Sequence, residues 1–186
     1  MKKLTIVLGL FLSLAVSCRR EEQPHSSSED TRAARKTPPA ATSTGTDVGS
    51  LMPEYSAMWL DGSKFDLETR RDKVVLLNVW ATWCGPCVFE IPELQAIHDK
   101  YAPRNFEVIG VSVDDLGVEP VQQFVNEHKM KYPIALDPDG NVANMLQTSV
   151  LPTTVLIDRD GKIVWKRFGQ IAPNDPELMK AIEAAL

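Results

Sequence analysis

Two cysteines separated by Gly and Pro, Cys84 and Cys87, constrain this sequence more than any other feature. The run from Val74 to Trp80 before them is apolar and β-branched apart from Asn78, which predicts a strand buried on both faces. After them apolar residues recur at helical spacing, and Pro92 is expected to kink the helix. A Cys-x-x-Cys pair between a buried strand and a helix is the context of a redox motif.

The position of Cys84 at the start of the predicted helix favours its thiolate. Unpaired backbone N–H groups and the positive end of the helix dipole stabilise negative charge there. The pKa of a cysteine falls in such places from about 8.5 to between roughly 3.5 and 7.5. We therefore expect thiol-disulfide exchange, in which Cys84 attacks as the nucleophile and Cys87, about one helical turn further, resolves the mixed disulfide.

Three other uses of the cysteine pair fit the sequence less well. A zinc site needs further ligands, and His98 and His128 are spaced for neither a zinc finger nor a catalytic site. Covalent haem attachment needs a histidine directly after the second cysteine, where this chain has Val88. A structural disulfide would close too short a loop to stabilise the fold much. No metal and no cofactor are expected.

Composition excludes several broad classes of protein. Three cysteines are too few for a zinc ribbon with two cysteine pairs or for a scaffold with several bridges. The formal net charge of −5 leaves no basic footprint of the kind that nucleic-acid binding requires. Residues 51–186 carry 13 basic and 20 acidic side chains, a net charge of −7, which argues against a polybasic lipid-binding patch.

The first 17 residues have the pattern of an export signal. Two lysines precede an apolar run of 13 residues, too short to cross a membrane that needs roughly 20. Residues 15–18, Ala-Val-Ser-Cys, resemble the bacterial lipobox, in which the cysteine is lipidated, with Ala where Leu is commonest. Cys18 is thus expected to anchor the chain, the alternative being an ordinary signal that leaves a spare thiol. Residues 18–50, rich in Ser, Thr, Pro, Ala and charge, are predicted to be a disordered linker.

The predicted folded domain spans residues 51–186 and has an α/β pattern. An Asp-Gly turn predicts a hairpin within residues 56–66. Further strands are expected at 106–113, 153–157 and 162–168, and helices at 121–128, 142–146 and 176–186. Because strands alternate with helices and a final hairpin and helix follow, we expect a central mixed sheet flanked by helices.

Several motifs resemble a known family. Trp83-Cys-Gly-Pro-Cys87 and Leu-Pro-Thr-Thr at 151–154 resemble the thioredoxin superfamily. Nearly all of residues 52–186 is similar to the TlpA/ResA family of exported, membrane-tethered thiol-disulfide oxidoreductases. The resemblance implies a thioredoxin-like fold with an N-terminal β-hairpin and a central insertion at roughly residues 114–147. Cytosolic thioredoxins carry a buried Asp where this chain has Asn78. The other matching motifs are residues 78–83, 111–115, 132–133 and 157–161.

The resemblance also implies roles for individual residues. Pro152 matches the cis-proline that faces the cysteine pair, and Leu151 before it would offer its backbone to a substrate. Trp83 matches a tryptophan beside the nucleophile and is expected to be partly exposed for partner contact. Glu90 matches a family glutamate and, if partly buried, could exchange a proton with Cys87. The alternative for Glu90 is a solvated acid that complements the helix dipole.

The function implied by the resemblance is reduction of disulfides in exported proteins, apocytochrome c among them. The mature domain has no thiol besides the pair, so electrons would come from another protein, a membrane thiol reductase. A peroxiredoxin-like peroxidase is one alternative, disfavoured because Ala81 stands where that class has Thr. A non-catalytic binding module that is tethered to the membrane is another. We expect the domain on the outer side of the cytoplasmic membrane, as a lipoprotein.

Overall fold

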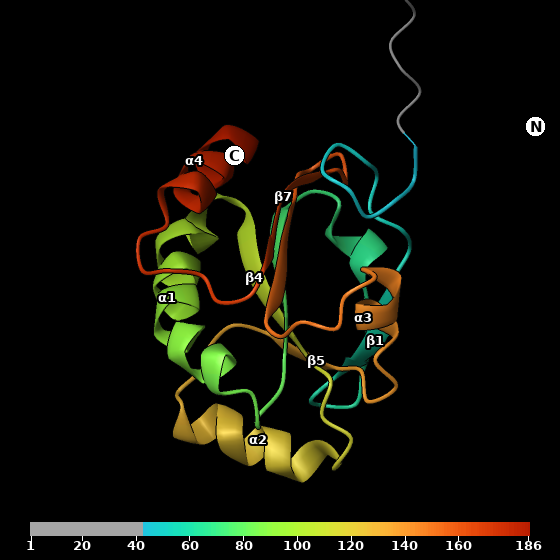
Figure 1. Ribbon diagram of the computed structural model, residues 1–186, viewed down its shortest axis with the longest axis vertical. Helices are drawn as coiled ribbons and strands as arrows, with labels where there is room; N and C mark the ends of the chain where they lie inside the picture. The colour runs from blue at the N-terminus through green and yellow to red at the C-terminus, as the bar shows by residue number, and fades with distance from the viewer. Residues whose placement is uncertain (1–42) are drawn as a thin grey trace, which may run out of the picture. The chain divides into compact units, whose positions relative to one another are not determined.

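The computed structural model describes residues 43–186, and within them a seven-stranded sheet forms the centre (Figure 1). The strand order is β2-β1-β5-β4-β3-β6-β7. The neighbours β3, β4 and β5 pair in parallel and all other pairs are antiparallel, which confirms the predicted mixed sheet. The strands are β1 Ser56–Trp59, β2 Lys64–Asp66, β3 Val74–Trp80, β4 Phe106–Ser112, β5 Ile134–Leu136, β6 Thr153–Ile157 and β7 Ile163–Phe168.

Helices cover both faces of this sheet. Figure 1 shows α1 and α4 on one side and α3 on the other, with α2 beyond one end of the strands. Helix α1 continues through Pro92 as one element. The kink expected at Pro92 stays a prediction. The helices are α1 Gly85–Tyr101, α2 Val118–Glu127, α3 Asn141–Met145 and α4 Pro176–Ala185, with 3-10 turns at Leu67–Arg70 and Ala102–Arg104.

The central strand β3 separates two hydrophobic clusters. All seven of its residues are buried, which confirms the prediction of a strand covered on both faces. Val74, Leu76 and Trp80 pack on the side of α1 and α4, and Val75 and Val79 pack on the side of α3. Because a fully buried aliphatic side chain contributes roughly 1.5–3 kcal/mol, β3 is a rigid support for the segment that follows it.

Two parts of the fold differ from the sequence prediction. Strand β5, inside the expected central insertion, was missed, because three residues show too little periodicity to reveal a strand. The ordered fold also begins before residue 51: Gly49 N donates to Ile163 O at 2.7 Å, and Thr44 forms an isolated bridge with Leu51. The end of the predicted linker is therefore part of the folded unit.

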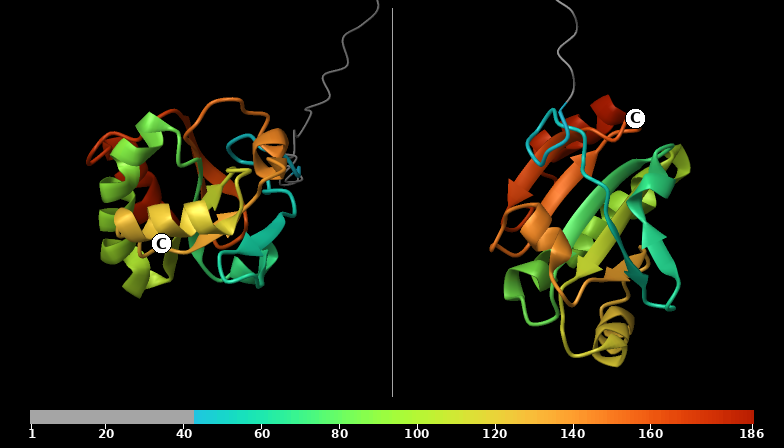
Figure 2. Two further views of the ribbon diagram at one scale, coloured as in Figure 1. Left: turned by 90° about the horizontal axis from the view of Figure 1, so that it is seen from below. Right: turned by 90° about the vertical axis from the view of Figure 1, so that its right-hand side faces the viewer.

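The β1–β2 hairpin and β7 occupy opposite edges of the sheet, as the right-hand view of Figure 2 shows. The expected export signal and Cys18 lie outside the described residues. Among residues 43–186, no helix combines the length and the apolar character that a membrane span requires.

Candidate active site

The cysteine pair lies where β3 passes into α1. Cys84 is the N-cap of α1, and its Sγ accepts a hydrogen bond from Cys87 N at 3.3 Å. The two cysteines form a disulfide with their Cα atoms 5.3 Å apart. Cys84 is 5% exposed and Cys87 1%, so the disulfide is recessed below the surface. The first turn of α1 contains no acidic residue, so no side-chain carboxylate of that turn opposes a thiolate at Cys84.

Asp114, two residues after β4, anchors the loop that leads into the disulfide. Its carboxylate accepts hydrogen bonds from Thr82 N at 3.0 Å and from Thr82 Oγ1 at 2.6 Å. It also accepts a bond from Ser112 Oγ at 2.6 Å, and it is 4% exposed. Asp114 thereby fixes the segment before Cys84 against the neighbouring strand. The sequence prediction missed this role, although Asp114 lies in one of the family-like motifs.

Glu90 is buried beneath the disulfide-bearing end of α1. It is 1% exposed, which excludes the alternative of a solvated acid. Its Oε1 accepts from Asn78 Nδ2 at 2.7 Å and its Oε2 from Ile171 N at 2.8 Å. Burial raises the pKa of Glu90 to about 7, although both hydrogen bonds favour the charged form. The carboxyl group can therefore gain or lose a proton near neutral pH.

Asn78 joins this carboxylate to the neighbouring strand. Its Nδ2 atom also donates to Thr154 Oγ1 on β6 at 2.9 Å. The residue that stands in place of the cytosolic family's Asp is therefore a hydrogen-bond donor to Glu90 rather than a second acid. Within this hydrogen-bonded group of Asn78, Glu90 and Thr154, Glu90 is the residue with an ionisable side chain.

The segment before β6 lies at the same end of the strands as the disulfide. The start of β6 is next to the end of β3 there, because Thr153 pairs with Val79. The Leu151–Pro152 bond is cis, as the resemblance implied, and Pro152 O accepts from Gly169 N at 2.7 Å. Within residues 43–186 the backbone N–H and C=O of Leu151 make no hydrogen bond. Its backbone is therefore available to an incoming chain.

Trp83 precedes the disulfide and is 68% exposed, in line with the partial exposure that was expected. His98 lies further along α1, where its Nδ1 accepts from Val108 N at 3.4 Å, so it packs within the fold. Among the described residues, no group of three or more His, Cys, Asp or Glu side chains could hold a metal ion.

The disulfide is recessed at the start of a helix, at one end of a mixed sheet, with a buried carboxyl group beneath it. These features define a thioredoxin-fold thiol-disulfide oxidoreductase. Residues 47–182 match the family model described as Redoxin, and the chain belongs to this family.

Individual relatives agree with that class. The thiol-disulfide oxidoreductase ResA of Bacillus thuringiensis is 34% identical over 123 residues, which cover 66% of this chain and 70% of the relative. A structure provisionally assigned as the thiol:disulfide interchange protein DsbE of Chlorobium tepidum has a TM-score of 0.70 and 28% identity, covering 76% of this chain and 99% of that one. A secreted thiol-disulfide isomerase of Corynebacterium glutamicum has a TM-score of 0.64 and 27% identity, with coverages of 71% and 82%.

Proposed function

We propose that this oxidoreductase reduces disulfides of exported proteins through Cys84 and Cys87. In the reduced enzyme, the Cys84 thiolate attacks one sulfur of a client disulfide, and the other client sulfur leaves as a thiolate. Cys87 then attacks Cys84 Sγ, which releases the second client thiol and forms the Cys84–Cys87 disulfide. Two electrons pass from the enzyme to the client. The observation that carries this proposal is the N-cap position of Cys84, where the helix favours a thiolate.

Glu90 is proposed to hold and release the proton of Cys87. Resolution requires Cys87 to lose its thiol proton before it attacks, and a carboxylate with a pKa near 7 is matched to that step at neutral pH. Glu90 follows Cys87 by one helical turn and is buried with it, so proton exchange with bulk water is restricted. This role would replace that of the Asp that is absent at position 78.

Trp83, Leu151 and Pro152 are proposed to receive the client. The exposed indole of Trp83 offers apolar contact area beside Cys84. The free backbone groups of Leu151 can form main-chain hydrogen bonds with an extended client segment, in the manner of an added strand. Pro152 fixes this segment at the end of the strands where the disulfide lies.

The location and the partners are further proposals. The export signal and lipobox-like pattern support a domain outside the cytoplasm that is anchored through lipidated Cys18. Electrons would come from a membrane thiol reductase, because the domain has no third thiol. Apocytochrome c is the client suggested by the family resemblance.

Reduction of insulin disulfides by the protein in the presence of dithiothreitol tests the proposed activity. Cys84→Ser should lower the rate at least about a hundredfold, since serine is not a nucleophile toward disulfides at neutral pH. Cys18→Ser is the matched control and should keep the wild-type rate. Retention of the rate by Cys84→Ser would overturn the assignment of Cys84 as the nucleophile, and a wild-type rate no higher than that of dithiothreitol alone would indicate a non-catalytic binding module.

A further inference from the structure

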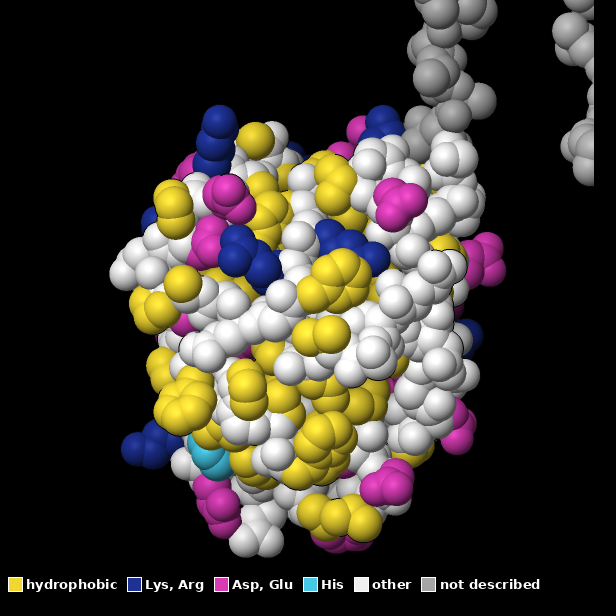
Figure 3. Space-filling model, viewed as in Figure 1, with side chains coloured by type: hydrophobic (Ala, Val, Ile, Leu, Met, Phe, Trp, Pro, Cys, Tyr) yellow, Lys and Arg dark blue, Asp and Glu magenta, His cyan; other side chains and the backbone are white. Residues whose placement is uncertain are grey.

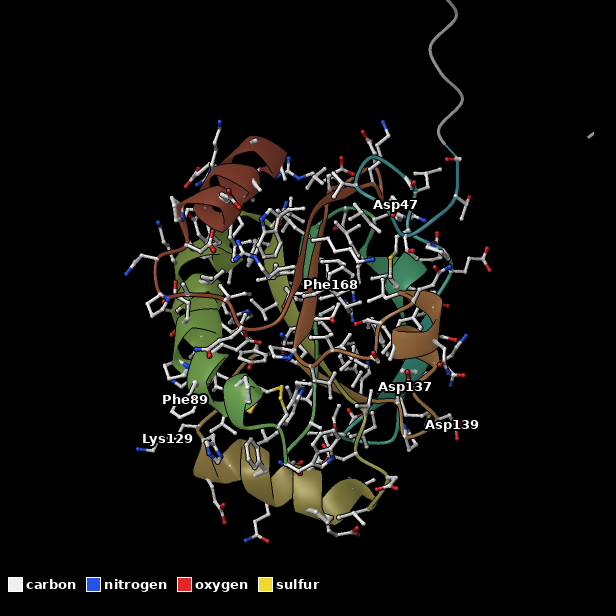
Figure 4. All side chains as sticks on the ribbon, viewed as in Figure 1. Asp47, Phe89, Lys129, Asp137, Asp139 and Phe168 are labelled. Carbon is white, nitrogen blue, oxygen red and sulfur yellow. A yellow bond between two sulfur atoms is a disulfide. The ribbon has the colours of Figure 1, made fainter. Side chains whose placement is uncertain are left out.

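The carboxyl group of Glu90 accepts one hydrogen bond on each of its two oxygens. Glu90 faces the interior, whereas its sequence neighbour Phe89 is 76% exposed, and Figure 4 shows Phe89 on the outer side of α1. Oε1 accepts from Asn78 Nδ2 at 2.7 Å, and Oε2 accepts from Ile171 N at 2.8 Å. Both donor residues are buried. This arrangement suits an ionised carboxylate, which only accepts hydrogen bonds.

The protonated form of Glu90 cannot keep both of these bonds as they are. A protonated carboxyl group has one O–H, which donates, and one C=O, which accepts. The N–H of Ile171 belongs to the backbone and stays a donor, so it requires the oxygen without the proton. The proton therefore belongs on Oε1, which faces Asn78 Nδ2. Two donors that face each other in a buried site would both be left without a partner.

We infer that the side-chain amide of Asn78 turns over when Glu90 gains a proton, and that Thr154 completes the hydrogen bonding in both states. This inference rests on the proposed function, in which Glu90 takes the proton of Cys87. In the ionised state Asn78 Nδ2 donates to Glu90 Oε1 at 2.7 Å and to Thr154 Oγ1 at 2.9 Å. A half turn about the Cβ–Cγ bond exchanges Nδ2 and Oδ1. The oxygen Oδ1 then accepts from the O–H groups of Glu90 and Thr154.

The residue types in this group permit the turn. An amide carries donor hydrogens on its nitrogen and acceptor lone pairs on its oxygen, and a hydroxyl group can donate or accept. Asn78 and Thr154 pair in the register of β3 and β6 and are 2% and 0% exposed, so bulk water cannot replace a lost bond. Asn78 is therefore a positioning residue that acts through Glu90. It lets the buried carboxyl group gain and lose a proton without losing its hydrogen bonds.

Tyr132 lies where the turned amide needs an acceptor. Asn78 pairs with Thr154 on one side of β3 and with Gly110 on the other. The ring of Tyr132 passes 3.3 Å from the position that a Cβ atom at Gly110 would take. The Tyr132 hydroxyl is buried and has no hydrogen-bond partner within residues 43–186. It is free to accept from Asn78 Nδ2 once the amide has turned.

Other titratable groups near Glu90 come from several elements. Cys87 shares α1, and Tyr132 precedes β5; burial and the charge of Glu90 raise the pKa of Tyr132. Arg167 and Asp175 flank the segment between β7 and α4 and form an ion pair with each other at 2.9 Å. Figure 3 shows mainly apolar side chains just above α2 and charged side chains toward the rim of that face. The pKa of Glu90 itself is raised by burial and lowered by its two hydrogen bonds.

NMR spectra of the oxidised full chain report the orientation of Asn78 directly. Nuclear Overhauser cross-peaks between the Nδ2 protons of Asn78 and the methyl group of Thr154 should be strong at about pH 9. They should lose most of their intensity at about pH 5. Glu90→Gln should show the weak cross-peaks at both pH values, because its amide N–H faces Asn78 as the acid O–H does. Glu93→Gln, the same change on the same helix, should behave as the wild type.

Thr154→Val distinguishes a turning amide from a fixed one. With a turning amide, the ionised state leaves one N–H of Asn78 without an acceptor, whereas the protonated state leaves only a lone pair unused. Because an unmet donor costs more, the pKa of Glu90 should rise by about 0.7, or about fivefold in proton affinity. The 13C shift of the carboxyl carbon measures it. With a fixed amide, both states lose the same bond and the pKa stays. Thr154→Ser keeps the hydroxyl and should keep the wild-type pKa.

Equal cross-peak intensities at the two pH values, or an unchanged pKa of Glu90 in Thr154→Val, would overturn the inference. If Thr154→Val does not fold, the cross-peaks of the wild type and of Glu90→Gln decide. The pH profile of disulfide exchange by the reduced protein tests the proposed function separately. A pKa of Glu90 that moves in Thr154→Val together with the exchange profile supports both. If the pKa moves and the profile does not, the proposed role of Glu90 toward Cys87 fails and the turning amide stands.

Discussion

Two buried carboxylates lie on opposite faces of the sheet and differ in what surrounds them. Asp137, on the side of α3, is 4% exposed and accepts bonds from Tyr55 Oη, Asn141 Nδ2 and Val142 N at 2.7–3.2 Å. Its Val142 partner belongs to the first turn of α3. Glu90, on the side of α1, has two donors and lies one helical turn from Cys87.

The comparison shows that two buried carboxylates of one fold can have different surroundings. Asp137 joins a helix start, a tyrosine from the N-terminal segment and a loop that follows β5, so its bonds hold parts of the fold together. Glu90 is also tied to other segments, but burial brings its pKa to about 7, where a proton can be exchanged. Removal of each charge should therefore have different consequences for stability and for disulfide exchange.

The largest effect on stability is expected at Asp137. Asp137→Ala leaves the buried Tyr55 hydroxyl and the Val142 N–H without their acceptor and should lower the free energy of unfolding by about 4 kcal/mol. Urea denaturation measures this change. Asp139→Ala, at an exposed position of the same loop, should change stability by less than about 0.5 kcal/mol. A loss below about 1 kcal/mol in Asp137→Ala would contradict a structural role for this carboxylate.

A smaller, pH-dependent effect is expected at Glu90. Its pKa in the folded protein, about 7, exceeds the ordinary value of 4.5, so between these pH values the folded state keeps a proton that the unfolded state has lost. The contribution of Glu90 to stability is therefore greatest below pH 4.5 and declines by about 3 kcal/mol as the pH rises to about 7. Denaturation of the oxidised protein at several pH values measures this decline.

Glu90→Gln has no carboxyl proton to lose and should abolish this part of the pH dependence. Glu93→Gln makes the same chemical change on the same helix and should retain it. In the reduced protein, Glu90→Gln should also change the pH profile of disulfide exchange, because the proton acceptor proposed for Cys87 is removed. An unchanged profile would show that Glu90 acts only as a buried structural group.

The parts of the fold that the sequence predicted are those with local signals. The six apolar residues of β3, the helical spacing after Cys87 and the Asp-Gly turn each identify an element without reference to the rest of the chain. Strand β5 has only three residues and is defined by pairing with β4 and β1, which are distant in sequence. Short strands that depend on such partners leave little trace in a local pattern.

The residues of the candidate site also fall into two groups, those that a local motif identifies and those that tertiary contacts define. The motif identified Cys84 and Cys87, but the burial of Glu90 depends on Asn78 and on Ile171, which is 81 residues away in sequence. The role of Asp114 likewise arises from contact with Thr82, which follows the neighbouring strand β3. The surroundings of Glu90 and Asp114 are set by tertiary contacts, which no spacing rule predicts.

Trapping of a mixed disulfide tests the central claim most directly. The full chain with Cys87→Ala is reduced, mixed with a protein that contains disulfides, and analysed by mass spectrometry under non-reducing conditions. The account predicts a covalent adduct on Cys84 that dithiothreitol releases, and no adduct when Cys84 is replaced by Ala as well. Equal adduct formation in both variants, or none in either, would contradict the assignment of Cys84 as the attacking thiol and Cys87 as the resolving thiol.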